Sequence, residues 1–169
     1  VLPYSSYRIV ETVCPTGYRS DDGSIITHDF DIVENGKIVD LTDTIKNKPI
    51  TGNFDLQKML TSQNNGMSTT SKPEAGIEFT ALLKKTVDEK FGGDYKAAYK
   101  AIFNQEACGE DHTTPDDSQI IRDADGNILF TTREYDVMVT NNSGMAYSRD
   151  LAYGEYYIFQ SSHSDSVVD

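Results

Sequence analysis

A short internal repeat is the sequence feature that most limits how this chain can fold. The segment Leu151–Gln160, LAYGEYYIFQ, matches the segment Leu2–Glu11, LPYSSYRIVE, in Leu, Tyr, Tyr and Ile at the same spacing. Aromatic and β-branched residues of this kind favour strands, and a repeat indicates a recurring structural unit. We therefore expect the chain to begin and end at equivalent points of a β-module, as an out-of-phase section of an array.

A break between two such units lies within the stretch Asp43–Leu60. Pro49 cannot donate a hydrogen bond to a strand ladder, and Gly52 allows the backbone to turn. One β-unit should therefore end here and another should begin. The sequence predicts a boundary between residues 1–49 and residues 50–169.

The remaining pattern predicts mostly strands and turns. Strands are expected near residues 7–13, 25–33, 38–41, 76–84, 119–122, 128–132 and 135–140, with a loop over 61–73. The Asn35-Gly36 pair predicts a hairpin between the second and third of these strands. Apolar residues recur at helical spacing between Val87 and Asn104, and Asp94 is a natural N-cap, so at least one helix is expected there.

The excess of acidic residues limits the kinds of molecule that this chain could bind. The chain has 169 residues, with 27 acidic against 15 basic side chains and a formal net charge of −12. This is enough for one ordinary domain or two small ones. So acidic a surface disfavours nucleic acid and anionic membranes as partners, and no apolar run approaches the roughly 20 residues of a membrane span.

Three polar residues fall on the apolar faces of expected strands. Side chains of a strand alternate between its two faces, which places Lys58 with Phe54, Leu56 and Leu60, Asn47 with Leu41 and Ile45, and Glu11 with Tyr7, Ile9 and Val13. Lys and Glu are rarely buried unless they are paired, so a shared core site is one interpretation. The alternative is that each lies at a sheet edge with its polar end in water.

Five segments resemble one known family in the family's own order. LPYSSYRIVETVCPTGY resembles the signature of collagen-adhesin B-type (CnaB, prealbumin-like) domains of Gram-positive surface adhesins and pilins. TIKNKP is similar to the last strand of that family and GNFDLQKM to its first strand. KPEAGIEFTALLKK and TNNSGMAYSRDLAYGEYYI resemble two further strand segments. The resemblance covers most of the chain except Thr86–Asp125.

This resemblance implies an all-β fold of Ig-like or prealbumin-like β-sandwich modules. Residues 1–49 would be the C-terminal half of one module, and residues 50–169 the N-terminal part of the next, with a short helical insertion at about 86–125. The second module has Gln160 where the first has Glu11. The sequence is thus either a fragment of an array, or residues 1–49 complete residues 50–169 in a permuted or exchanged arrangement.

The resemblance also implies a self-directed chemistry. Lys58 matches the nucleophilic lysine, Asn47 the asparagine that accepts it, and Glu11 the glutamate that promotes the isopeptide bond. A lysine in an apolar core becomes neutral and nucleophilic, while a buried glutamate stays protonated and can shuttle protons. Only ten residues separate Asn47 from Lys58, and parallel neighbouring strands need a longer connection. We therefore expect any such bond to link chains head to tail.

The expected role is structural rather than enzymatic. The chain would be a stalk or repeat module of an extracellular, cell wall-anchored adhesin or pilin, with neighbouring modules or chains as partners. An alternative is a ligand-binding adhesin module that uses residues 86–125 to bind a host or matrix ligand. A secreted enzyme is disfavoured because no catalytic set beyond Lys58, Glu11 and Asn47 stands out. No cofactor or metal is expected.

Other candidate sites are weaker. Asp123–Asn127 faintly resembles a calcium loop, but no closing Glu follows, so a plain β-turn is favoured. The three histidines, His28, His112 and His163, lack metal-like spacing. Cys14 and Cys108 lie in different expected units, so a disulfide between them is disfavoured. Cys14 near His28 could supply a thiol nucleophile, although a small turn or core residue is the favoured interpretation.

Overall fold

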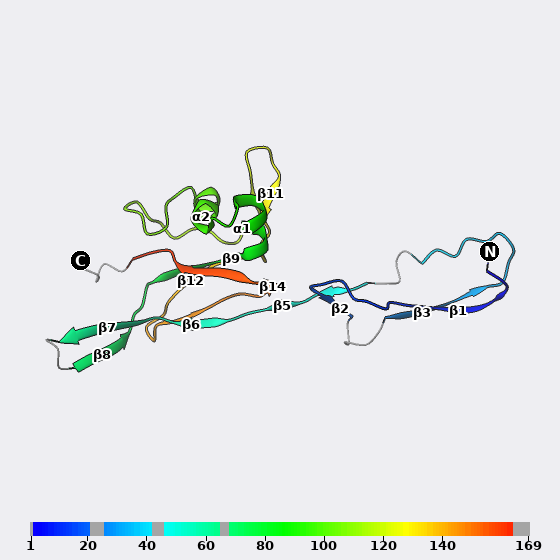
Figure 1. Cartoon of the computed structure of the whole chain (residues 1–169), viewed down its shortest axis with the longest axis horizontal. Helices are drawn as coiled ribbons and strands as arrows, with labels where there is room; N and C mark the ends of the chain where they lie inside the picture. The colour runs from blue at the N-terminus through cyan, green and yellow to red at the C-terminus, as the bar shows by residue number, and fades with distance from the viewer. Residues whose placement is uncertain (1, 21–25, 42–45, 65–67, 164–169) are drawn as a thin grey trace. The chain divides into compact units, whose positions relative to one another are not determined.

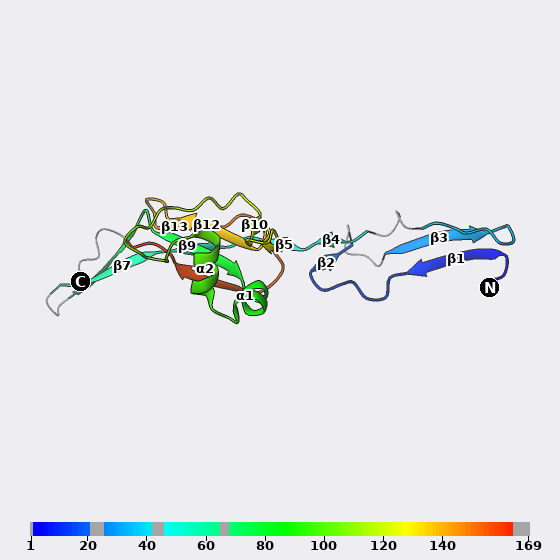
Figure 2. The same ribbon diagram turned by 90° about the horizontal axis from the view of Figure 1, so that it is seen from above.

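The computed structural model describes residues 2–20, 26–41, 46–64 and 68–163. The chain forms two compact units, Val1–Ile50 (unit 1) and Thr51–Asp169 (unit 2) (Figures 1 and 2). The break follows Pro49 and precedes Gly52, where the ladder is interrupted. Each unit is described by itself below.

Unit 1 consists of two antiparallel strand pairs. Strand β1 (Ser5–Val10) pairs with β3 (Thr27–Ile32), and β2 (Tyr18–Arg19) pairs with β4 (Lys48–Pro49). Across β1 and β3, the rings of Tyr7 and Phe30 stack with centroids 5.5 Å apart, and Arg8 Nε lies 2.6 Å from Asp29 Oδ1. Cross-strand pairs of this kind stabilise a two-stranded ribbon.

Unit 1 has no packed core in its described part. Among those residues, Ser20 is the only buried one, whereas the exposed large apolar side chains are Leu2, Tyr4, Ile9, Val10, Val13, Tyr18, Val33 and Ile38. Isolated two-stranded ladders are at best marginally stable in water. The described residues of unit 1 therefore bury less apolar surface than a stable two-stranded unit requires.

The expected hairpin around Asn35-Gly36 is wrong in its partner strand. The turn is present, with Gly36 at φ 73°, but β3 pairs with β1, and residues 38–41 form no strand. The apolar alternation of β3 is satisfied equally well by β1, which presents Tyr7 opposite Phe30. Local turn chemistry does not decide between two possible partner strands.

Unit 2 is built on a three-stranded antiparallel sheet in the order β12 (Tyr135–Val139), β9 (Glu78–Leu83), β15 (Tyr156–Gln160). The central strand β9 is buried at every position but Phe79, which is half-buried. A strand buried on both faces must be covered on both. Helices α1 (Lys84–Phe91) and α2 (Tyr95–Phe103) cover one face (Figure 1).

The helical region behaves as its spacing predicts. Asp94 caps α2, since its side chain accepts hydrogen bonds from the backbone N–H groups of Lys96 and Ala97, both at 3.0 Å. Helix α1 ends at Gly92, whose φ of 61° suits a left-handed C-cap. The core beneath the helices is formed by Leu82, Val87, Ala98, Phe130 and Tyr135. The helices are therefore an integral layer of unit 2.

The opposite face of β9 packs against short strands. Strand β5 (Thr51–Gly52) pairs with β14 (Leu151–Ala152), and β6 (Asp55–Gln57) pairs with β13 (Met145–Tyr147). The buried residues of this second core are Ala81, Met138, Ala146 and Leu151, against which Phe54 and Leu56 pack. Unit 2 is therefore a β-rich fold with open sheets and two short helices.

Two hairpins complete unit 2. Strand β10 (Ile121–Arg122) pairs with β11 (Ile128–Phe130) around Asp125-Gly126, as predicted. Strand β7 (Met59–Asn64) pairs with β8 (Ser68–Pro73), so the loop expected over 61–73 is wrong. These strands are rich in Ser, Thr and Gln and carry no apolar alternation, which is the signal that a strand prediction relies on. Their ladder depends on backbone hydrogen bonds.

A buried carboxyl of β12 contacts Arg149 and Asp117. Asp136, in β12, is 3% exposed and accepts a hydrogen bond from the backbone N–H of Arg149 at 2.8 Å. Burial raises the pKa of Asp136 to about 6, and a hydrogen bond with the Asp117 carboxyl adds to the shift. The Arg149 guanidinium, 3.6 Å from Asp136 Oδ1, acts in the opposite direction.

We expect acid to stabilise unit 2 through Asp136. Its folded pKa of about 6 exceeds the unfolded value near 3.9, so the folded state binds more protons between these limits. The stabilisation is complete below about pH 4 and is lost as pH rises through 6, by about 1–3 kcal/mol. Asp136→Asn should flatten this pH dependence, measured by denaturant unfolding from pH 4 to 7. Asp55→Asn, at an exposed position, should leave it unchanged; equal slopes for both variants would contradict the assignment.

Candidate functional site

Unit 1 brings Glu11 and Asn47 into direct contact. Glu11 follows β1 and its backbone N–H bonds to Ile26 O at 2.9 Å, while Asn47 directly precedes β4. The β2–β4 ladder, extended by a bond from Ile50 N to Gly17 O at 2.7 Å, carries Asn47 to the end of β1. Asn47 Nδ2 donates a hydrogen bond to Glu11 Oε1 at 2.7 Å. The Glu11 carboxyl thus contacts Asn47 Nδ2, which is the nitrogen that would leave as ammonia in the isopeptide reaction implied by the family resemblance.

The other end of the same amide contacts a thiol. Cys14 Sγ lies 3.6 Å from Asn47 Oδ1 and 3.1 Å from Tyr18 O. Desolvation, and secondarily the charge of Glu11, raises the pKa of Cys14, so the thiol is protonated and can donate its single hydrogen to one of the two oxygens at a time. Sequence reasoning assigned Cys14 to a turn or core. Only the fold shows that it lies beside Asn47, because residues 33 positions apart carry no local signal.

Lys58 belongs to unit 2 and contacts a different amide. It lies between β6 and β7, and its Nζ donates to Gln160 Oε1 at 3.0 Å. Gln160 is the last residue of β15, and its Nε2 donates to Ser162 O at 2.7 Å. The amide oxygen of Gln160 is therefore turned toward Lys58 and its nitrogen away. By the internal repeat, Gln160 occupies in unit 2 the position that Glu11 occupies in unit 1.

The alternation predicted for Lys58 is present, but a fully buried site is not. Phe54, Leu56, Lys58 and Leu60 are half-buried, while the residues between them are exposed. Glu11 and Asn47 are likewise half-buried. The three polar residues are therefore neither fully buried nor fully exposed. In unit 1, the described strands have no second layer that would bury Glu11 and Asn47 further.

The backbone around Lys58 is tightly constrained. Its N–H donates to Gly144 O at 2.8 Å, and its carbonyl accepts from Glu74 N at 3.2 Å. Glu74 is 7% exposed and directly follows Pro73, which pairs with Met59 at the end of the β7–β8 ladder. Sequence reasoning did not single out this carboxyl, since it precedes the strand expected at 76–84.

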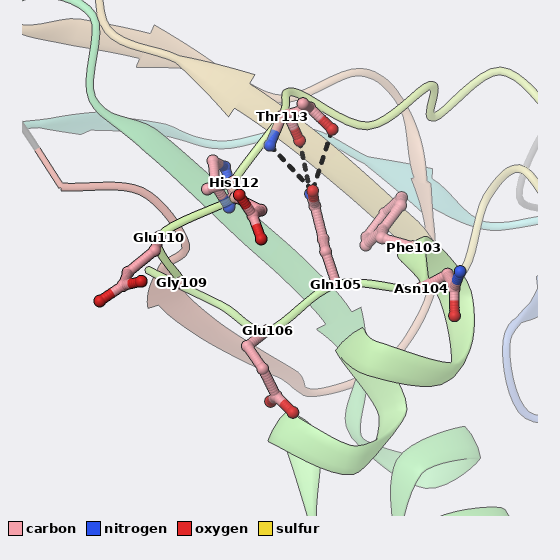
Figure 3. A pocket seen from close by; sticks show the side chains of 9 residues that line it. Phe103, Asn104, Gln105, Glu106, Gly109, Glu110, His112 and Thr113 are labelled. Atoms are coloured by element: carbon pink, nitrogen blue, oxygen red, sulfur yellow. Dashed lines mark hydrogen bonds between the residues drawn. The ribbon is translucent and has the colours of Figure 1, made fainter.

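A second polar cluster lies under the insertion. Glu78 is 2% exposed and accepts a hydrogen bond from Ser161 Oγ at 2.6 Å, and its Oε1 is 3.2 Å from His112 Nε2. His112 also lines a cavity of about 400 Å³ formed by the loop from Phe103 to Thr113 (Figure 3). Gln105 holds this loop by accepting the Thr113 N–H at 2.8 Å. The contact between His112 and Glu78 therefore joins this loop to β9.

The remaining sequence candidates form no further site. Asp123 Oδ1 accepts backbone hydrogen bonds from Asp125 and Asn127 at 3.0 and 2.8 Å, which is the turn favoured from the sequence. Both cysteines carry free thiols. Within the described ranges, no group of His, Cys, Asp and Glu residues could hold a metal ion. In the same part of the chain, no helix is long and apolar enough to cross a membrane.

Gly144 should be essential to the position of Lys58. It adopts a φ of 70°, and an added Cβ would collide with Lys58 O and crowd Glu74 N. We expect Gly144→Ala to cost about 1–2 kcal/mol for the left-handed conformation and a further 1–3 kcal/mol for the collision. Gly126→Ala is the matched control, because Gly126 has a φ of 85° and open space around it. Urea unfolding that shows equal losses for both would contradict the close approach.

Comparison with known proteins adds no assignment to this geometry. No protein-family model, curated protein or solved structure matches the chain. The functional argument therefore rests on the contacts of Glu11 and Asn47 in unit 1 and of Lys58 in unit 2.

Proposed function

We propose that this chain is a structural module of an extracellular, cell wall-anchored adhesin or pilin of the collagen-adhesin B type. Its strands would belong to prealbumin-like sandwich modules, and Lys58 and Asn47 would form an isopeptide bond promoted by Glu11. The observation that carries the proposal is the 2.7 Å hydrogen bond between Asn47 Nδ2 and Glu11 Oε1. A carboxyl within hydrogen-bond reach of a side-chain amide is positioned to transfer a proton to or from that amide.

The contacts of Asn47 suit attack by an amine. As a lysine Nζ adds to the amide carbon, negative charge develops on Oδ1 and a proton must reach Nδ2 before ammonia leaves. Glu11 is in hydrogen-bond contact with Nδ2, so it can relay that proton. The Cys14 thiol lies beside Oδ1 and can donate a weak hydrogen bond to the developing charge. Two neighbours thus serve the two atoms whose charges change.

The nucleophile is proposed to come from a second copy of the chain. Asn47 and Lys58 belong to different units, and the short connection between them disfavours parallel pairing within one molecule. Unit 1 also exposes Val13, Val33 and Ile38 at 80%, 69% and 90%. Such side chains favour burial against another polypeptide. Unit 2 of the next copy, which carries Lys58, is the proposed cover, and repeated exchange would join copies head to tail.

A ligand-binding adhesin module is the second candidate. The observation in its favour is the cavity of about 400 Å³ in the loop 103–113, within the predicted insertion. Removing the whole insertion would not test this role, because Val87, Ala98 and Tyr99 belong to the buried core. Replacing Glu110 and Asp111, which line the cavity and are exposed, by Lys is the better test. Unchanged binding of the variant to matrix-coated surfaces would argue against this role.

The proposed crosslink predicts a covalent ladder. Purified full-length chain at high concentration should give bands at multiples of the monomer mass on denaturing, reducing gels. Each link should lower the mass by about 17 Da, since ammonia is expelled. Asn47→Ala and Lys58→Arg should each abolish the ladder, and Glu11→Gln should slow it by about 100-fold or more. Lys72→Arg, at an exposed position in β8, is the control. A single monomer band under all conditions would refute the crosslink.

A further inference from the structure

We propose that Lys58 and Gln160 condense within unit 2 to form an intramolecular isopeptide bond. This inference rests on the proposed function in one respect, namely that Lys58 is a nucleophile toward side-chain amides. It adds a second amide partner that competes with Asn47 of another copy. The outcome of that competition would decide whether a chain extends the assembly or closes on itself.

The two side chains are already in contact. Lys58 Nζ lies 3.0 Å from Gln160 Oε1, and the amide carbon lies one C=O bond, about 1.2 Å, beyond that oxygen. Reacting atoms about 3–3.5 Å apart form a near-attack geometry. Nζ has to shift from the oxygen toward a face of the amide to reach it, and the lysine side chain has a flexible four-carbon stem that allows such a shift. Both residues are half-buried, so the contact is partly shielded from water.

The surrounding backbone fixes both partners. Lys58 is held by Gly144 O and Glu74 N on either side of its peptide unit. Gln160 is held by the β15–β9 ladder, in which it pairs with Phe79. The bond from Gln160 Nε2 to Ser162 O at 2.7 Å turns the leaving nitrogen away from the lysine. The lysine nitrogen therefore lies on the oxygen side of the amide and has to move over the amide plane to reach its carbon.

The internal repeat gives the contact a second basis. Gln160 and Glu11 occupy equivalent positions, and each contacts a member of the proposed crosslink: Glu11 contacts Asn47 and Gln160 contacts Lys58. In unit 1 this position carries a carboxyl, which can promote a reaction but has no amide nitrogen to lose. In unit 2 it carries an amide, which can itself be the electrophile.

The reaction balances without an oxidant or a further reactant. The Lys58 ammonium first gives up a proton, and the lone pair on Nζ forms a bond to the amide carbon of Gln160. Nε2 then takes a second proton from Nζ, the bond from the carbon to Nε2 breaks, and the nitrogen leaves as ammonia, which takes up the first released proton as ammonium. The products are a secondary amide that joins residues 102 positions apart and one ammonium ion.

Closure would end an assembly at one side only. A closed chain has no lysine to offer at position 58, but it retains Asn47 and Glu11 in unit 1. It can therefore accept the Lys58 of another copy and cannot attack one. Closure is unimolecular, whereas the link to another copy depends on concentration, so dilution should favour closed monomers.

The test is the intact mass of the monomer, purified from the full chain at low concentration under denaturing, reducing conditions. The expected species is about 17 Da lighter than the sequence mass, and digestion should release one branched peptide that contains both Lys58 and Gln160. Gln160→Asn, which shortens the side chain, and Lys58→Arg should restore the unmodified mass. Lys72→Arg and Gln57→Asn are the matched controls and should keep the lighter mass.

The two proposals fail in different ways. Asn47→Ala should abolish the ladder and leave the closed monomer, whereas Gln160→Asn should abolish the closed monomer and increase the ladder. A monomer entirely at the unmodified mass overturns the Lys58–Gln160 bond, whether or not a ladder forms. The bond is equally overturned if the 17 Da loss persists in Gln160→Asn, or if it maps to a cyclised Asn35-Gly36 pair.

Discussion

The pairing of β9 with strands on both sides is the constraint on which unit 2 depends. Because β9 bonds to β12 and β15 and is buried on both faces, each face must receive a separate apolar layer. The helices provide one, and Phe54 and Leu56 provide part of the other. Gln160 lies at the end of β15 and Lys58 continues the strand that carries Leu56. The candidate contact in unit 2 is thus a direct result of covering the second face of β9.

Unit 1 presents the opposite situation. Its strands pair side chains across the β1–β3 ladder, yet Ser20 is the only fully buried residue among those the structure describes in this unit. A hydrogen bond between a half-buried amide and a carboxyl has a modest net effect on stability, so Asn47 and Glu11 cannot replace a missing core. In the proposed crosslink, an arriving strand would bring unit 1 both apolar cover and an amine.

The sequence predicted some of these features through short-range physics and missed others that depend on long-range packing. The alternation around Lys58 and the cap at Asp94 follow from the local backbone, and both are present. Glu78 lies on the polar side of β9 by alternation and would be placed in solvent, but the helices cover that side and bury it. The contact of Cys14 with Asn47 has no local signal at all. The β7–β8 ladder was missed because its strands lack an apolar face.

Gly144 has no side chain, yet it determines the backbone position of Lys58, whose amine is the proposed nucleophile. Its missing side chain leaves room for the carbonyl of Lys58, and its own carbonyl accepts the Lys58 N–H. The position of the Lys58 backbone, and so the range of its side chain, thereby depends on a turn 86 positions further along the chain. A mutational scan scored by crosslinking should therefore identify this turn as sharply as it identifies the reactive side chains. Among related sequences, a substitution of this glycine would prevent the proposed crosslinking even where Lys58, Asn47 and Gln160 are all retained.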